Sequence, residues 1–215
     1  VIIMSVPIDS INFIIFSYFH PFFPTITNFK SSSTFSLYFI KAFILYKKDN
    51  FMILAIDMGN TNIVIGGIDN EKTYFLERIT THTTRTELEY SMYIKGILDI
   101  HGVKAKDIEG AILSSVVPPL NITIRNAVKK ILGIECMLVE SGMKTSLNIL
   151  MDNPKSVGSD MIVDAIAAMS EYPLPLAVID MGTATTISVV DIHGNYIGGI
   201  IHPGLRISLD TLSSK

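Results

Sequence analysis

Two short segments of the sequence carry residue types that are suited to binding phosphate. The tetrapeptide Ile-Asp-Met-Gly at residues 56–59 returns at residues 179–182, each time followed by small hydroxyl or amide residues. Glycine lets backbone N–H groups approach an anion, and short polar side chains donate hydrogen bonds to its oxygens. An aspartate beside them can hold a hard cation, directly or through water. One Asp-x-Gly is more often a simple tight turn, but two in parallel contexts predict a ligand cleft between similar halves.

Regular elements are predicted around these turns, and they would hold the polar residues in place. Apolar runs predict strands at 52–57, 62–68, 73–80, 108–117 and 136–140. A capping-box pattern at Thr86 and Glu89 begins a helix that ends near Gly102, and Pro118-Pro119 opens another that Gly133 stops. A third helix is predicted at 159–171, before Pro173. After Leu176 the strand-turn-strand pattern begins again, so the order of elements predicts an α/β fold.

Composition limits the classes of function. The 215 residues are 48% hydrophobic, enough for one large core or two small ones, and the net charge of −3 gives no basic field for a nucleic acid. The lone cysteine, Cys136, excludes an internal disulfide and lies in an apolar run, which predicts a buried, inert thiol in a reducing, cytosolic compartment.

The first 51 residues differ in composition from the rest. They are rich in Phe, Ile, Tyr and Ser and are interrupted at Pro7, Pro21 and Pro24, without a continuous apolar run of the roughly 18 to 20 residues that a bilayer-spanning helix needs. We expect residues 1–51 to be a leader outside the fold, with Met52 as the natural start. An aromatic N-terminal extension, or a membrane-associated one, is the alternative.

Five ordered motifs resemble a known family. "DMGNTN" and "DMGTATT" look like the two phosphate loops of the acetate kinase/sugar kinase/heat-shock 70/actin superfamily, and "SSVVPPL", "DNPKSVGSD" and "GGIIHPGL" narrow the resemblance to type III pantothenate kinases. The resemblance implies duplicated actin-like ATPase (ribonuclease H-like) domains, the second incomplete. Residues 52–172 would form the first lobe and 173–215 the beginning of the second.

The same resemblance implies an activity and its ligands. Members transfer the γ-phosphoryl group of ATP to pantothenate, the first step of coenzyme A biosynthesis, as cytoplasmic homodimers. They use Mg²⁺ and a monovalent cation, K⁺ or NH₄⁺. Neither a nucleic acid nor a membrane is expected as a partner.

Residue roles are implied where the motifs match. Asp160 would accept the proton of the attacking hydroxyl, although from the residues alone a helix N-terminal carboxylate favoured by the dipole is the commoner explanation. Asp180 would hold the monovalent cation, Thr183 would contact ATP, and Asp57 would lie near Mg²⁺, directly or through water. Pantothenate would meet Gly158, Ser159, Asp160 and Met161. The first ATP phosphate loop would comprise Asp57, Met58, Gly59, Asn60, Thr61, Asn62, Ile63 and Val64.

The sequence departs from the family pattern around the acceptor. Met161 stands where the family has Arg, Met151 where it usually has Tyr, and Asp164 where it has Asn, and the family continues beyond Lys215. These changes predict weakened or altered acceptor binding with ATP binding retained. Two alternatives to a kinase stay open: a non-catalytic nucleotide-binding or regulatory relative, and an inactive product of a truncated gene.

Overall fold

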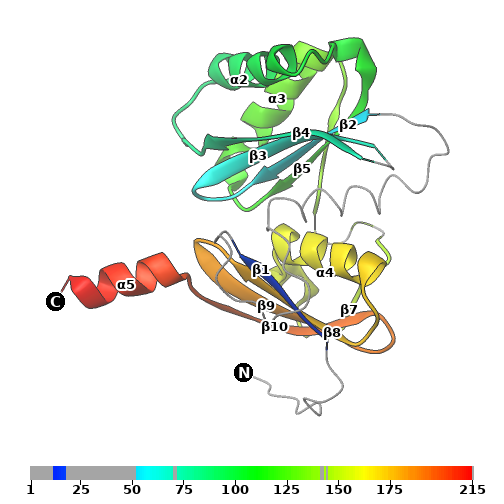
Figure 1. The fold of residues 1–215 in the computed structure, drawn as a ribbon, viewed down its shortest axis with the longest axis vertical. Coiled ribbons are helices and arrows are strands. Elements are labelled where there is room, and N and C mark those ends of the chain that lie inside the picture. The colour runs from blue at the N-terminus through cyan, green and yellow to red at the C-terminus, as the bar shows by residue number, and fades with distance from the viewer. Residues whose placement is uncertain (1–11, 18–51, 70–71, 141–142, 144, 215) are drawn as a thin grey trace. The chain divides into compact units, whose positions relative to one another are not determined.

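The computed structural model describes residues 12–17, 52–69, 72–140, 143 and 145–214 (Figure 1). The chain divides into two compact units, one formed by Leu37–Glu140 and the other by Val1–Ser36 together with Ser141–Lys215. We call them the first unit and the second unit, in the order of the two Ile-Asp-Met-Gly segments, and describe each by itself.

The first unit contains a mixed five-stranded sheet among its described residues. Its order is β4 (Thr73–Thr80), β3 (Asn62–Ile68), β2 (Met52–Met58), β5 (Ile108–Ser115) and β6 (Cys136–Leu138). The first three strands form an antiparallel meander, and β5 and β6 run parallel to β2. Helices α2 (Glu87–Ile100) and α3 (Asn121–Leu132) pack against each other (Figure 1). Two short 3₁₀ helices, Ala105–Asp107 and Pro118–Leu120, complete the connections.

Local sequence signals set the helix ends of this unit. The Thr86 hydroxyl accepts a hydrogen bond from the Glu89 N–H at 3.4 Å, and the Glu89 carboxylate accepts one from the Thr86 N–H at 2.7 Å, so the predicted capping box is confirmed. Gly133 ends α3 in the left-handed conformation, with φ of 72°, which glycine adopts without a steric penalty.

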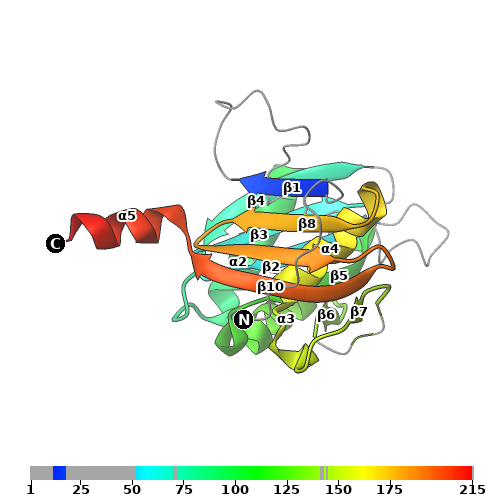
Figure 2. The ribbon, with the colours of Figure 1, turned by 90° about the horizontal axis from the view of Figure 1, so that it is seen from below.

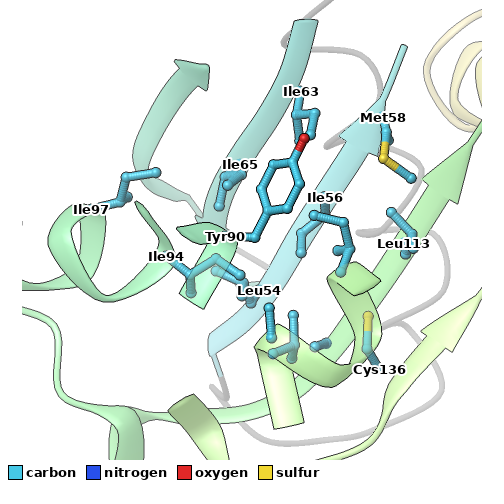
Figure 3. Packing of buried hydrophobic residues seen from close by; sticks show 14 of the residues in the cluster. Leu54, Ile56, Met58, Ile63, Ile65, Tyr90, Ile94, Ile97, Leu113 and Cys136 are labelled. Atoms are coloured by element: carbon cyan, nitrogen blue, oxygen red, sulfur yellow. The ribbon is translucent and has the colours of Figure 1, made fainter. Parts of the chain in front are cut away.

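The core of the first unit lies between the sheet and these two helices (Figure 3). Leu54, Ile56 and Met58 alternate along β2 toward this core, as the two-residue period of a strand requires. Tyr90 of α2 is fully buried against them and carries its hydroxyl toward the Ile63 end of β3 (Figure 3). Cys136 is buried in the same cluster, as predicted, and burial raises the pKa of its thiol to about 12. The thiol is therefore protonated at neutral pH.

The second unit contains another mixed five-stranded sheet among the described residues. Its order is β1 (Asn12–Ser17), β8 (Leu176–Met181), β9 (Ala184–Val190), β10 (Asn195–Pro203) and β7 (Asn148–Ile149). Helix α4 (Ser159–Glu171), preceded by the 3₁₀ helix Pro154–Ser156, packs on β8 and β9. Helix α5 (Leu205–Ser213) extends from the end of β10 (Figure 2).

The two sheets pair their strands in the same way around β2, which carries Asp57, and β8, which carries Asp180. In the first unit β2 pairs antiparallel with β3 and parallel with β5; in the second unit β8 pairs antiparallel with β9 and parallel with β1. Each meander also has an aspartate after its second strand that accepts backbone hydrogen bonds in the next turn: Asp69 from the Lys72 N–H at 2.7 Å and Asp191 from the His193 N–H at 2.8 Å. The α/β prediction is confirmed, and the predicted strands 62–68 and 73–80 have the observed bounds.

Two features differ from the sequence analysis. The units divide after Glu140, whereas we placed the lobe boundary after Tyr172, because α4 packs on β8 and β9 and so belongs to the second unit. Asn12–Ser17 form strand β1 beside β8, whereas we expected residues 1–51 to lie outside the fold. The leader prediction for residues 1–11 and 18–51 lies outside the described residues.

Candidate phosphate-binding and catalytic site

The first Asp-Met-Gly turn joins β2 to β3. Asp57 lies one residue before the end of β2, opposite Val64 of β3 and Ser114 of β5. The Gly59 N–H donates to the Asn62 carbonyl at 3.0 Å and closes the turn. A side chain at position 59 would begin 3.2 Å from that carbonyl oxygen, so glycine suits the close approach. Asn60 and Thr61 at the tip of the turn are exposed.

Neighbouring strands hold this turn from both sides. On the β4 side, Thr81 donates its N–H to the Thr61 carbonyl at 2.9 Å and its hydroxyl to the Gly59 carbonyl at 2.7 Å. On the β5 side, the Val116 N–H donates to the Met58 carbonyl at 3.0 Å. Three hydrogen bonds from outside the turn therefore fix its backbone.

The Ser-Ser-Val-Val-Pro-Pro-Leu segment has a structural part in this arrangement. The Ser115 hydroxyl donates to the Asn121 side-chain oxygen at 2.6 Å and accepts from the Val117 N–H at 3.0 Å. These bonds join the end of β5 to the start of α3 and so set the path of Val116, whose N–H donates to the first Asp-Met-Gly turn.

The second Asp-Met-Gly turn joins β8 to β9. The Gly182 N–H donates to the Ala184 carbonyl at 2.9 Å, and Met181 pairs with Thr185, so this turn is one residue shorter than the first, in which Met58 pairs with Ile63. The Gly204 N–H donates to the Thr183 carbonyl at 2.9 Å. A side chain at position 204 would overlap the carbonyl oxygens of Gly182 and Thr183, so the glycine of His-Pro-Gly-Leu lets this backbone approach the turn.

Asp160 lies in the first turn of α4. Its carboxylate accepts the Met161 N–H at 2.9 Å and lies over Gly158, where any side chain would overlap it. Burial raises the pKa of Asp160 above its usual range, although backbone hydrogen bonds oppose the shift. A carboxylate with a raised pKa is a stronger proton acceptor than an exposed one, which suits the predicted role.

The Met161 side chain is buried, which differs from the predicted contact with a substrate. It is 4% exposed, and its sulfur lies 4.0 Å from the Tyr196 hydroxyl, which in turn lies 3.4 Å from the Ser188 hydroxyl. Consecutive helical residues point about 100° apart, so the side chains of Asp160 and Met161 leave α4 in different directions. An arginine at this position would place a charge in the core of the second unit. Burial raises the pKa of Tyr196, and the nearby charge of Asp160 raises it further.

The predicted site residues divide between the two units. The turn at 57–64 belongs to the first unit, and Gly158, Ser159, Asp160, Asp180 and Thr183 belong to the second. In the described part of the chain, no three His, Cys, Asp or Glu side chains gather as a metal site.

Sequence reasoning missed the residues that support the site. Thr81 lies in the polar run that follows β4, where a role was predicted only for the helix cap at the end of the run. The many threonines in this run were the available signal. Tyr196 gave no signal, because its contact with Met161 of α4 joins residues 35 apart in the sequence, and the Ser188 hydroxyl lies near this site through Tyr196 on the neighbouring strand.

Comparison with known proteins gives a family. A family model described as type III pantothenate kinase matches residues 53–215. A curated type III pantothenate kinase from Halalkalibacterium halodurans is 43% identical over 161 residues, which are 75% of this chain and 63% of that protein. The chain thus spans less than two thirds of the length of this relative.

Solved structures of similar fold are more distant. A Bacteroides thetaiotaomicron protein described as having an actin-like ATPase fold is 14% identical, with a TM-score of 0.38 over 52% of this chain and 40% of that one. The Aquifex aeolicus Ppx/GppA phosphatase, type II variant, is 14% identical, with a TM-score of 0.45 over 75% and 55%. These likenesses concern the fold alone. Among the helices that the structure describes, none has the length and apolar character to cross a bilayer.

Proposed function

We propose, because this chain belongs to the type III pantothenate kinase family, that it transfers the γ-phosphoryl group of ATP to the primary hydroxyl of pantothenate. The observation that carries the proposal is the similarity over residues 53–215, which takes in both Asp-Met-Gly turns and the Asp160 segment. The product would be 4'-phosphopantothenate, in the first step of coenzyme A biosynthesis.

The first turn would bind the nucleotide phosphates. Its closed backbone and exposed tip at Asn60 and Thr61 suit an anion, and Asp57 would hold Mg²⁺, directly or through water. Bound Mg²⁺ would neutralise charge on the phosphate oxygens during transfer. Thr183 would contact ATP from the second turn, and Asp180 would hold K⁺ or NH₄⁺.

The head of α4 would bind the acceptor. Asp160 would take the proton of the pantothenate hydroxyl as the new bond to phosphorus forms, and its burial-raised pKa supports this assignment. Gly158 and Ser159 would present backbone groups to pantothenate. Met161 is left out of this proposal because its side chain is buried. A cytoplasmic homodimer is part of the proposal, and sedimentation velocity would test the dimer.

A kinase assay tests the proposal. With ATP, Mg²⁺ and K⁺, the chain should convert pantothenate to a product heavier by one phosphoryl group, with equimolar ADP release. Asp160→Asn should lower kcat by roughly 10²- to 10⁴-fold, as expected for loss of a general base. Asp99→Asn, at an exposed position paired with Lys95, is the matched control and should act as the wild type. ATP binding without any turnover would favour the non-catalytic nucleotide-binding alternative instead.

A further inference from the structure

Thr81 lies outside the first Asp-Met-Gly turn and makes two hydrogen bonds to it. Its N–H donates to the Thr61 carbonyl at 2.9 Å and its hydroxyl to the Gly59 carbonyl at 2.7 Å. Both acceptors are carbonyl groups on one short loop, so Thr81 draws two peptide planes of the turn to the same side.

The orientation of those peptide planes matters for anion binding. In a trans peptide the carbonyl of one residue and the N–H of the next point in opposite directions. With the Gly59 and Thr61 carbonyls directed at Thr81, the N–H groups of Asn60 and Asn62 point away from it. Backbone N–H groups that share a direction at a tight turn form the concave donor site that binds phosphate.

A second group fixes Thr81 in turn. The Tyr90 hydroxyl donates to the His82 carbonyl at 2.8 Å and accepts the His82 N–H at 3.2 Å, so both backbone polar groups of the residue after Thr81 are bound to one phenol. Tyr90 is 0% exposed and belongs to the core cluster between sheet and helices (Figure 3). A rigid core residue thereby sets the position of the segment that carries Thr81.

From this geometry we infer that Thr81 is a positioning residue of the first phosphate turn, and that Tyr90 holds it in place through the backbone of His82. Thr81 turns the Asn60 and Asn62 N–H groups toward the phosphates of ATP without contacting the nucleotide itself. The inference rests on the proposed function for its ligand, but the orientation of the turn is a property of the first unit alone.

Two variants at position 81 isolate the hydroxyl. Thr81→Val keeps the shape and removes the donor, whereas Thr81→Ser keeps the donor and removes a methyl group. Thr84→Val, at an exposed position in the same segment, is the matched control. We expect Thr81→Val to raise the KM for ATP and weaken ATP·Mg²⁺ binding in calorimetry by about 3- to 10-fold, the equivalent of one hydrogen bond, with kcat changed less. Thr81→Ser and Thr84→Val should stay within about twofold of the wild type.

Hydrogen exchange in the absence of nucleotide separates the inference from the proposed function. Thr81→Val should speed exchange at the Gly59 amide, which is bonded to the Asn62 carbonyl, and at the amide of residue 81, which is bonded to the Thr61 carbonyl. Tyr90→Phe should do so to a smaller degree. If ATP fails to bind the wild type but exchange responds as expected, the proposed function is wrong and the positioning role stands. Unchanged exchange at the amides of residues 59 and 81 in Thr81→Val, or a Thr81→Ser variant as impaired as Thr81→Val, would overturn the positioning role.

Discussion

Asp160 combines two opposed demands at the scale of one residue. In the proposed role of proton acceptor it would gain from a raised pKa, but the burial that raises the pKa also makes its ionised form costly in the folded protein. Functional carboxylates often carry such a cost, and it can be measured apart from catalysis.

Asp160→Asn should therefore stabilise the protein at neutral pH. Because the folded-state pKa is raised, folding is favoured by this group below the unfolded pKa of about 3.9, and that contribution is lost as the pH rises through the folded pKa. Asparagine keeps an oxygen for the Met161 N–H and has no charge to bury. We expect a higher Tm than the wild type at pH 7 and no difference near pH 3.5, measured by calorimetric scans across pH.

The control is Asp210→Asn at an exposed position, which should show no comparable pH-dependent gain in Tm. If the Tm of Asp160→Asn at pH 7 lies below that of the wild type, the assigned direction of the Asp160 pKa shift is wrong.

The two hairpin turns show how elements hold the site residues. The first turn is held by side-chain and backbone donors from Thr81 and Val116, whereas the second is held by the backbone of Gly204 at the start of α5. The second turn therefore depends on a close approach of two backbones, which only glycine allows at position 204.

Gly204→Ala should disturb the second turn. Its methyl group would overlap the carbonyl oxygens of Gly182 and Thr183, and these backbone atoms yield less easily than a flexible side chain. We expect a loss of about 1 to 3 kcal/mol in the free energy of unfolding of the second unit, as for other overpacked sites. Gly198→Ala on β10 is the control, since a methyl group there meets nothing within 4 Å. Urea denaturation of both variants provides the comparison, and equal stabilities would show that the Gly204 contact is dispensable.

Elements with local signals were predicted well from the sequence. Thr86 with Glu89 and Gly133 mark helix ends through contacts a few residues away, and both predictions are confirmed. The burial of Met161 and the turn contacts of Thr81 were not predicted, because their partners lie 35 and about 20 residues away in sequence. The predicted lobe boundary after Tyr172 differs from the division of the units after Glu140, because the helical pattern of 159–171 does not say which sheet the helix covers.

At the scale of the whole molecule, β8 and β2 occupy equivalent places. Each bears the aspartate of its turn, and each has an antiparallel neighbour on one side and a parallel neighbour on the other. The parallel neighbour of β2 is β5, which lies within the residues matched by the family model. The parallel neighbour of β8 is β1, which precedes the matched residues. A strand with both edges paired has its N–H and C=O groups satisfied, whereas an open edge leaves a row of them exposed.

A chain shortened to begin at Met52 distinguishes the two interpretations of residues 1–51. If they are a leader outside the fold, as the composition predicts, all folded structure should survive their removal. The pairing of Asn12 with Leu176 through Ser17 with Met181 gives the opposite expectation for β8. We expect the amides of Leu176–Met181 that face β1 to exchange on the order of tenfold faster in the shortened chain, the equivalent of about one net hydrogen bond, while those of Met52–Met58 keep their protection. The β2 amides serve as an internal control because they lie in the other unit. If hydrogen exchange shows equal protection of β8 in the two chains, residues 12–17 do not protect this strand and the leader prediction holds for them. Something other than β1 would then cover this edge of the second sheet.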